Sequence, residues 1–76
     1  MTTRTRVVRS GAGEPIVLVH GVGLDLGMWD ELVQELGGEF ELIRYDMLGH
    51  GGTPLPPGGV DLDRFVSQLD AVLRDQ

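Results

Sequence analysis

Two apolar runs flank an amphipathic segment in the first half of the chain. Residues 16–19 read Ile-Val-Leu-Val without a polar position, which predicts a central strand of a parallel sheet, buried on both faces. Residues 40–46 form a second buried-looking stretch and predict another strand. Between the two runs, apolar residues recur at helical spacing at Met28, Trp29, Leu32, Val33 and Leu36. This βαβ order predicts an α/β fold with the two strands parallel.

The flanking segments predict an edge strand, a turn, a loop and a final helix. Residues 4–9 favour a strand near the sheet edge, and residues 10–15 favour a turn. Residues 47–60 hold five glycines and three prolines, so we expect a long loop that is functional or mobile. A helix should start at Asp61 as N-cap, with one apolar stripe formed by Leu62, Phe65, Val66, Leu69, Val72 and Leu73.

Composition narrows the classes of protein. The 76 residues are 41% hydrophobic, and a domain of this size buries only about 60% of its unfolded surface, so a partner is expected to supplement the core. A net charge of -6 argues against nucleic acid. No apolar run reaches membrane-spanning length, and the start at Met1 lacks a signal-peptide pattern, so we expect a cytoplasmic protein. With no cysteine and two isolated histidines, we expect neither a metal nor a cofactor.

Chemistry is expected where the chain leaves the two parallel strands. Ligands of open parallel sheets bind beyond the carboxyl ends of the strands. Residues 20–24 and 46–53 leave these ends, and both segments are rich in glycine. Glycine lets a ligand oxygen approach backbone N–H groups without obstruction by side chains.

The motifs in these segments resemble the opening of the α/β-hydrolase family. They are Val19-His20-Gly21-Val22-Gly23, then Met28-Trp29, then the run from Arg44 to Thr53 that reads Arg-Tyr-Asp-Met-Leu-Gly-His-Gly-Gly-Thr. The second and third motifs are similar to those of 3-oxoadipate enol-lactonase-like hydrolases, although His20 departs from that group. The resemblance implies that residues 1–76 form the amino-terminal part of a single α/β-hydrolase domain, whose mostly parallel sheet is incomplete without a second chain.

The resemblance also implies a role for the His-Gly turn. In relatives, the N–H after the His-Gly pair points at the alkoxide of a tetrahedral intermediate, so the donor here would be Val22 or its neighbour Gly23. Loss of one such donor costs about 2.7–4 kcal/mol of transition-state stabilisation. The resemblance further implies that Gly21, Leu24 and Leu48 bind the substrate, with Leu24 and Leu48 lining an acyl pocket.

The nucleophile that this family requires is absent from the sequence. Ser10 and Ser67 both lack the G-x-S-x-G pattern of the nucleophile elbow. We therefore expect the chain alone to be inactive. A complementary carboxy-terminal chain would carry the Ser-His-Asp triad, and together they would hydrolyse a small ester, lactone or related carbonyl compound. The alternative is a non-catalytic truncated remnant or interaction module whose unfinished sheet pairs with another copy of the chain or with another protein.

Several residues have simpler interpretations. His20, at the end of a buried strand, is expected to satisfy a hydrogen bond, and His50 to lie on the solvated surface. Asp46 is expected to organise the loop that follows it. Met28 and Trp29 fit the buried face of the first helix.

A dinucleotide site is a third hypothesis. Gly21 and Gly23 follow a strand and precede a helix, and Asp46 lies about 20 residues further on. The fingerprint G-x-G-x-x-G would need its last glycine at Leu26, however, and Gly27 is one residue late. The spacing therefore disfavours this hypothesis.

Overall fold

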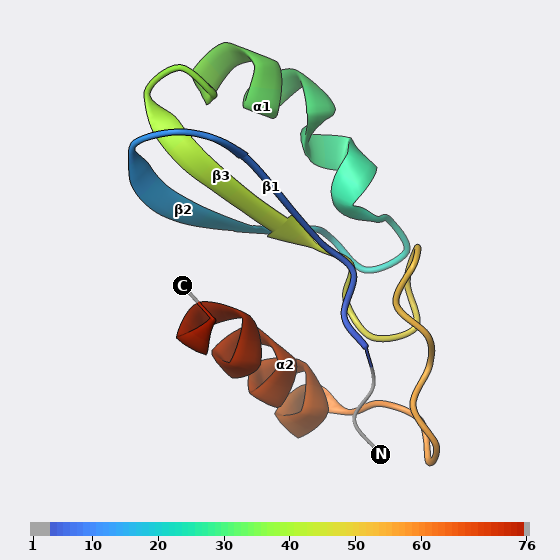
Figure 1. Cartoon of the computed structure of the whole chain (residues 1–76). Coiled ribbons are helices and arrows are strands. Elements are labelled where there is room, and N and C mark those ends of the chain that lie inside the picture. The colour runs from blue at the N-terminus through green and yellow to red at the C-terminus, as the bar shows by residue number, and fades with distance from the viewer. Residues whose placement is uncertain (1–3, 76) are drawn as a thin grey trace.

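A computed structural model describes residues 4–75 of the chain. Met1, on which part of the signal-peptide prediction rests, lies outside the described residues. The elements follow in the order β1 (Val7–Gly11), β2 (Glu14–Val19), the 3₁₀ turn η1 (Leu26–Trp29), α1 (Asp30–Leu36), β3 (Phe40–Tyr45) and α2 (Leu62–Arg74) (Figure 1). The predicted βαβ order is confirmed, and residues 47–60 form the expected loop without helix or strand.

The three strands form one sheet in the order β1-β3-β2. β3 pairs in parallel with β2, as predicted, and antiparallel with β1, which lies at the predicted edge. The prediction that residues 16–19 form a central strand is wrong for this structure. β3 takes the middle position, so within residues 4–75 β2 is an edge strand of the sheet. Val19 at its end is 41% exposed.

The turn between β1 and β2 passes closely over the start of β3. The predicted turn over residues 10–15 is shorter in the structure, because β1 extends to Gly11 and β2 begins at Glu14. Gly11 and Gly13 adopt φ angles of 80° and 126°. A Cβ atom on Gly13 would lie 2.2 Å from the carbonyl oxygen of Glu39, so this crossing requires glycine.

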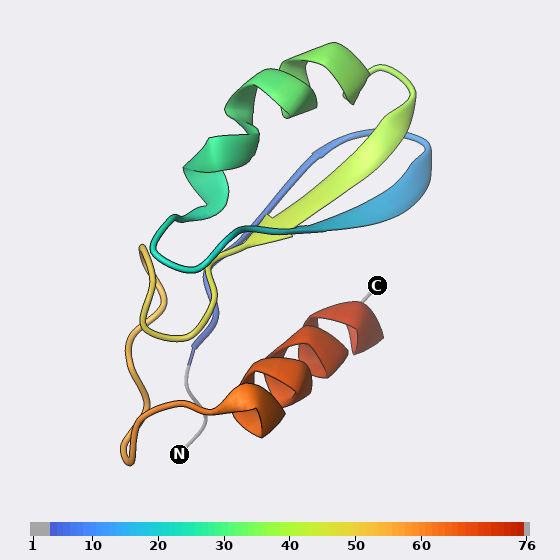
Figure 2. The same cartoon turned by 180° about the vertical axis from the view of Figure 1, so that it is seen from behind.

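The two helices cover opposite faces of the sheet, as the two opposite views show (Figures 1 and 2). Side chains of β3 alternate between these faces. Ile43 and Tyr45 form a buried cluster with Val72 of α2. On the other face, the guanidinium of Arg44 contacts the Asp30 carboxylate at the start of α1. β3 is therefore the strand on which both layers are built.

The first predicted helix begins with a tighter turn than its pattern indicated. Residues Leu26–Trp29 are 3₁₀, and the carboxylate of Asp25 caps them by accepting the N–H of Gly27 at 2.8 Å. Because a 3₁₀ turn has three residues per turn and not 3.6, Met28 leaves the buried face and is 47% exposed. The prediction that Met28 packs in the core is therefore wrong, while Trp29 is half-buried.

The last helix starts where its sequence predicts. The Asp61 carboxylate accepts the N–H of Arg64 at 2.9 Å, which confirms the N-cap. The predicted apolar stripe is only partly covered, because Leu62, Val66 and Leu73 are 76%, 57% and 50% exposed. The side of α2 that faces the sheet includes the buried polar residue Gln68, which the stripe did not include.

Candidate functional site

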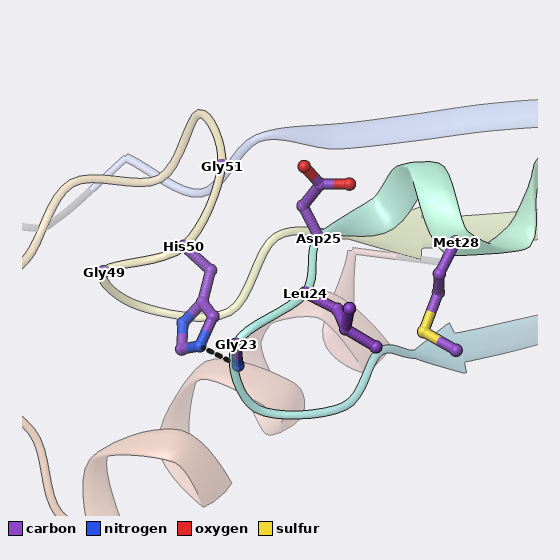
Figure 3. A pocket seen from close by; sticks show the side chains of 7 residues that line it. All are labelled: Gly23, Leu24, Asp25, Met28, Gly49, His50 and Gly51. Carbon is purple, nitrogen blue, oxygen red and sulfur yellow. Dashed lines mark hydrogen bonds between the residues drawn. The ribbon is translucent and has the colours of Figure 1, made fainter.

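Two loops lie next to each other at the carboxyl ends of the parallel strands. One follows β2 and leads into η1, and the other follows β3 (Figure 3). Between them is an open pocket of about 610 Å³. It is lined by Gly23, Leu24, Asp25, Met28, Gly49, His50 and Gly51. The two glycine-rich segments selected from the sequence therefore meet at one place.

Two histidines join these loops reciprocally. His20, at the end of β2, accepts the N–H of Met47 on its Nε2 atom at 2.9 Å. His50, in the loop after β3, accepts the N–H of Gly23 on its Nε2 atom at 3.1 Å (Figure 3). The ring centroids are 5.0 Å apart. Each loop thus contributes one imidazole that holds a backbone amide of the other loop.

The contacts of both rings define the same tautomer. Nδ1 of His20 lies 2.7 Å from the carbonyl oxygen of Gly21, and Nδ1 of His50 lies 2.9 Å from that of Leu48. A ring nitrogen that accepts an N–H carries no proton, so each Nδ1 must donate to its carbonyl. The structural interpretation of His20 is confirmed. The expectation that His50 is solvated surface is wrong, because the ring is half-buried and bonds to a loop distant in sequence.

The backbone N–H groups in the bend after His20 differ in their hydrogen-bond partners. Leu24 donates its N–H to the carbonyl of Gly21 at 3.1 Å, which closes the turn. The N–H of Gly23 is taken by His50. Among residues 4–75 the structure gives no hydrogen-bond partner for the N–H of Val22, whose residue is 82% exposed. Of the two amides singled out in the sequence, one is occupied and one is free.

Asp46 anchors both loops from a fully buried position. Its carboxylate accepts the N–H of Leu26 at 2.8 Å and that of Gly52 at 2.7 Å, and Arg6 lies at 3.3 Å. Burial raises the pKa of the Asp46 carboxyl, but the donors from Gly52, Leu26 and Arg6 outweigh it and hold the pKa below its usual range. The expectation that Asp46 organises the following loop is confirmed.

The dinucleotide hypothesis requires a carboxylate that can reach a ribose. The Asp46 carboxylate is 0% exposed, and its oxygens are bonded to protein donors. It is therefore not available to a ligand, and this hypothesis loses the residue that supported it.

Gln68 attaches α2 to the same region and was not identified from the sequence. Its Oε1 accepts the N–H of Leu48 at 2.9 Å, and its Nε2 donates to the carbonyl of Asp46 at 2.9 Å and to Oγ1 of Thr5 at 3.2 Å. The only available signal was a polar residue beside an apolar stripe, which does not predict three hydrogen bonds, two of them buried. Gln68 thereby links the N-terminal segment, the end of β3 and α2.

The two leucines expected to line one acyl pocket are separated. Leu24 lines the pocket between the loops. Leu48 is buried and lines a second cavity of about 260 Å³ beside α2, together with Thr5 and Gln68. The separation arises because Gln68 holds the backbone of Leu48 toward α2. Gly21 and Val22 lie in the bend but are not among the residues that line the first pocket.

Two further features concern ligands and membranes. Within residues 4–75, no three His, Cys, Asp or Glu side chains gather so that they could hold a metal ion. The helices in this part of the chain are all too short or too polar to cross a membrane.

Sequence comparison links this arrangement to known proteins. The chain matches the profile of the Alpha/beta hydrolase family over residues 16–76. It is 36% identical over 56 residues to (E)-2-((N-methylformamido)methylene)succinate hydrolase of Acinetobacter baylyi, covering 74% of this chain and 21% of that protein. It is 30% identical over 69 residues to pimeloyl-(acyl-carrier protein) methyl ester esterase of Aliivibrio salmonicida, covering 91% and 26%.

Structural comparison agrees with the sequence matches. The crystal structure of bromoperoxidase from Bacillus anthracis superimposes with a TM-score of 0.86 at 33% identity, covering 93% of this chain and 26% of that one. The chain thus spans about a quarter of the length of the proteins that it resembles.

Proposed function

Because this chain belongs to the α/β-hydrolase family, we propose that it contributes the oxyanion-hole turn of a serine hydrolase. The substrate is a small ester, lactone or related carbonyl compound. The observation that carries the proposal is the state of the bend after His20, where Leu24 and Gly23 donate within the protein and the N–H of Val22 has no partner among the described residues. Val22 is therefore the donor, and Gly23 supports the bend.

The chemistry explains why a free amide at this position matters. When a nucleophile attacks a carbonyl, negative charge develops on the oxygen, and fixed N–H dipoles stabilise it without reorganisation. In this fold one donor comes from a strand–helix loop that lies well before the nucleophile elbow in sequence, and a second comes from the residue after the nucleophile. The bend between β2 and η1 supplies the first, at the carboxyl end of a parallel strand where ligands bind.

The nucleophile has to come from outside these 76 residues. Ser10 lies in β1 and Ser67 in α2, and neither is among the residues that line the pocket between the loops. We propose that a complementary chain carries the Ser-His-Asp triad, and that this chain alone is inactive. The substrate class follows from two sources: the relatives named above include an esterase, and the motifs resemble those of enol-lactonase-like hydrolases.

A matched pair of variants tests the donor. Val22→Pro removes the N–H, whereas Val22→Ala keeps it and changes only an exposed side chain. In the assembly with the companion chain, hydrolysis of p-nitrophenyl acetate should fall about 10²–10³-fold in kcat for V22P and stay within about threefold for V22A. Equal kcat for both variants would rule out this amide as the donor.

The companion chain itself can be sought directly. Native mass spectrometry of the protein purified from its own cells should reveal a second polypeptide containing G-x-S-x-G, and ester hydrolysis should co-purify with it. A folded sample that contains this chain alone contradicts the proposal.

A non-catalytic interaction module is the second candidate function. The exposed apolar side chains on α2, Leu62, Val66 and Leu73, favour it because they offer a surface for another protein. A stable complex without hydrolytic activity, although every triad residue is present, would support this candidate over the first.

A further inference from the structure

His50, in the loop after β3, accepts the N–H of one of the two candidate amides in the bend between β2 and η1. Without an acceptor at Nε2 of His50, the amides of Val22 and Gly23 would both be unbonded. The ring lies beside Gly23 and lines the pocket (Figure 3), and its bond to the Gly23 N–H spans 27 positions of sequence. Among residues 4–75, no backbone carbonyl accepts either of these two N–H groups.

Backbone hydrogen bonds on both sides of His50 hold the segment that carries the ring. The backbone N–H of His50 donates to the carbonyl of Met47 at 2.9 Å, and its carbonyl accepts the N–H of Thr53 at 2.9 Å. Thr53 is itself buried and accepts the N–H of Arg6 on Oγ1 at 2.9 Å. The imidazole is therefore attached to an anchored backbone, and Nδ1 is directed at the carbonyl of Leu48.

We propose that His50 is a positioning residue for the Val22 turn: its neutral Nδ1–H imidazole captures the Gly23 N–H on Nε2 and, of the Val22 and Gly23 amides, leaves that of Val22 free. This inference rests on the proposed function for its consequence in catalysis. The bond itself is independent of that function, so the two can be tested apart. His20 makes the reciprocal contact. It accepts the N–H of Met47 and so fixes the loop that carries His50.

The tautomer provides a test that needs no variant. In the unmodified full chain, a long-range ¹H–¹⁵N NMR spectrum should show a protonated Nδ1 and a bare Nε2 for His50. A His50 ring protonated on Nε2 at neutral pH cannot accept an N–H and overturns the proposal. This measurement remains decisive even where a substitution at His50 prevents folding.

Two variants then separate the acceptor from the bulk of the ring. His50→Leu removes the acceptor, whereas His50→Gln offers Oε1 to the Gly23 N–H. Hydrogen exchange of the Gly23 amide should accelerate about tenfold in H50L and stay within about threefold of the unmodified chain in H50Q. The amide of Leu24, which donates to the carbonyl of Gly21, serves as the internal control and should change little. Equal exchange at Gly23 in H50L and H50Q overturns the proposal.

Activity reveals the consequence. In the assembly with the companion chain, kcat for p-nitrophenyl acetate should fall about tenfold in H50L with little change in KM, and H50Q should recover most of it. If V22P leaves kcat unchanged while the tautomer and exchange results hold, the oxyanion function fails and the positioning contact stands. If H50Q behaves as H50L in kcat, His50 does not position the donor.

Discussion

The carboxylate of Asp46 accepts the backbone N–H of Leu26 at 2.8 Å and so connects the end of β3 to the start of η1, 20 positions earlier. The same carboxylate takes the N–H of Gly52 in the following loop. One buried side chain therefore fixes the relative positions of the two loops that form the candidate site. The reciprocal histidine bonds act on a framework that Asp46 already holds.

Replacing Asp46 by Asn should destabilise the fold. The amide can accept one N–H, but its NH₂ group would face the donor of Gly52 or Leu26 in a buried position. We expect a loss of about 2–4 kcal/mol in the free energy of unfolding, measured by urea titration. Asp70→Asn is the matched control, since Asp70 pairs with Arg74 on the exposed surface and should change stability by less than about 0.5 kcal/mol. Similar losses for both variants would contradict the anchoring role.

The lowered pKa of Asp46 predicts an acid-sensitive fold. A carboxyl whose folded pKa lies below its unfolded value contributes stability above the unfolded pKa, near 3.9, and loses it as pH falls through the folded pKa. The urea midpoint should therefore decline below about pH 4. The decline should be shallower in D46N, which has no proton to bind at this position. Parallel pH curves for the two proteins would exclude Asp46 as the source.

Gln68 should contribute more to the stability of the fold than its position beside the apolar stripe of α2 indicates. Gln68→Leu keeps the size of the side chain but leaves the N–H of Leu48 and the carbonyl of Asp46 without their bonds. We expect a loss of about 2–3 kcal/mol in the free energy of unfolding. Ser67→Ala, at the exposed neighbouring position of α2, is the control and should be neutral or slightly stabilising. A stable Q68L protein would mean that apolar packing alone docks α2.

Alanine should affect stability differently at Gly13 and at Gly38, because only Gly13 lies where the β1–β2 turn crosses the start of β3. Gly13→Ala combines a positive φ with a Cβ that would lie 2.2 Å from the carbonyl oxygen of Glu39, and should cost about 2–4 kcal/mol. Gly38→Ala meets no atom within 4 Å and has no positive φ, so it should be neutral or stabilise by about 0.4–1 kcal/mol. Thermal unfolding of both variants checks this. A neutral G13A protein would show that the turn can move away from β3.

Residues close in sequence explain what could be predicted well. The start of β3, the cap at Asp61 and the parallel βαβ order all follow from periodicity and capping, which depend on neighbours within a few positions. The apolar run at residues 16–19 predicted that both faces of β2 are buried, but the other described residues cover these side chains only in part. The faces of β2 are covered only where other chain segments pack on them, and the chain spans about a quarter of the length of its relatives.

The sequence alone determined the α/β class, the family and the two glycine-rich segments that could hold chemistry, because motifs and periodicity are local properties. Only the tertiary structure revealed that the Gly23 amide is occupied, because the atom that accepts its N–H belongs to a histidine 27 positions away. The tertiary structure also places Leu24 and Leu48 in different pockets, because Gln68 of α2 holds the backbone of Leu48. A backbone N–H has no side-chain signature, and whether it is free depends on what folding brings beside it.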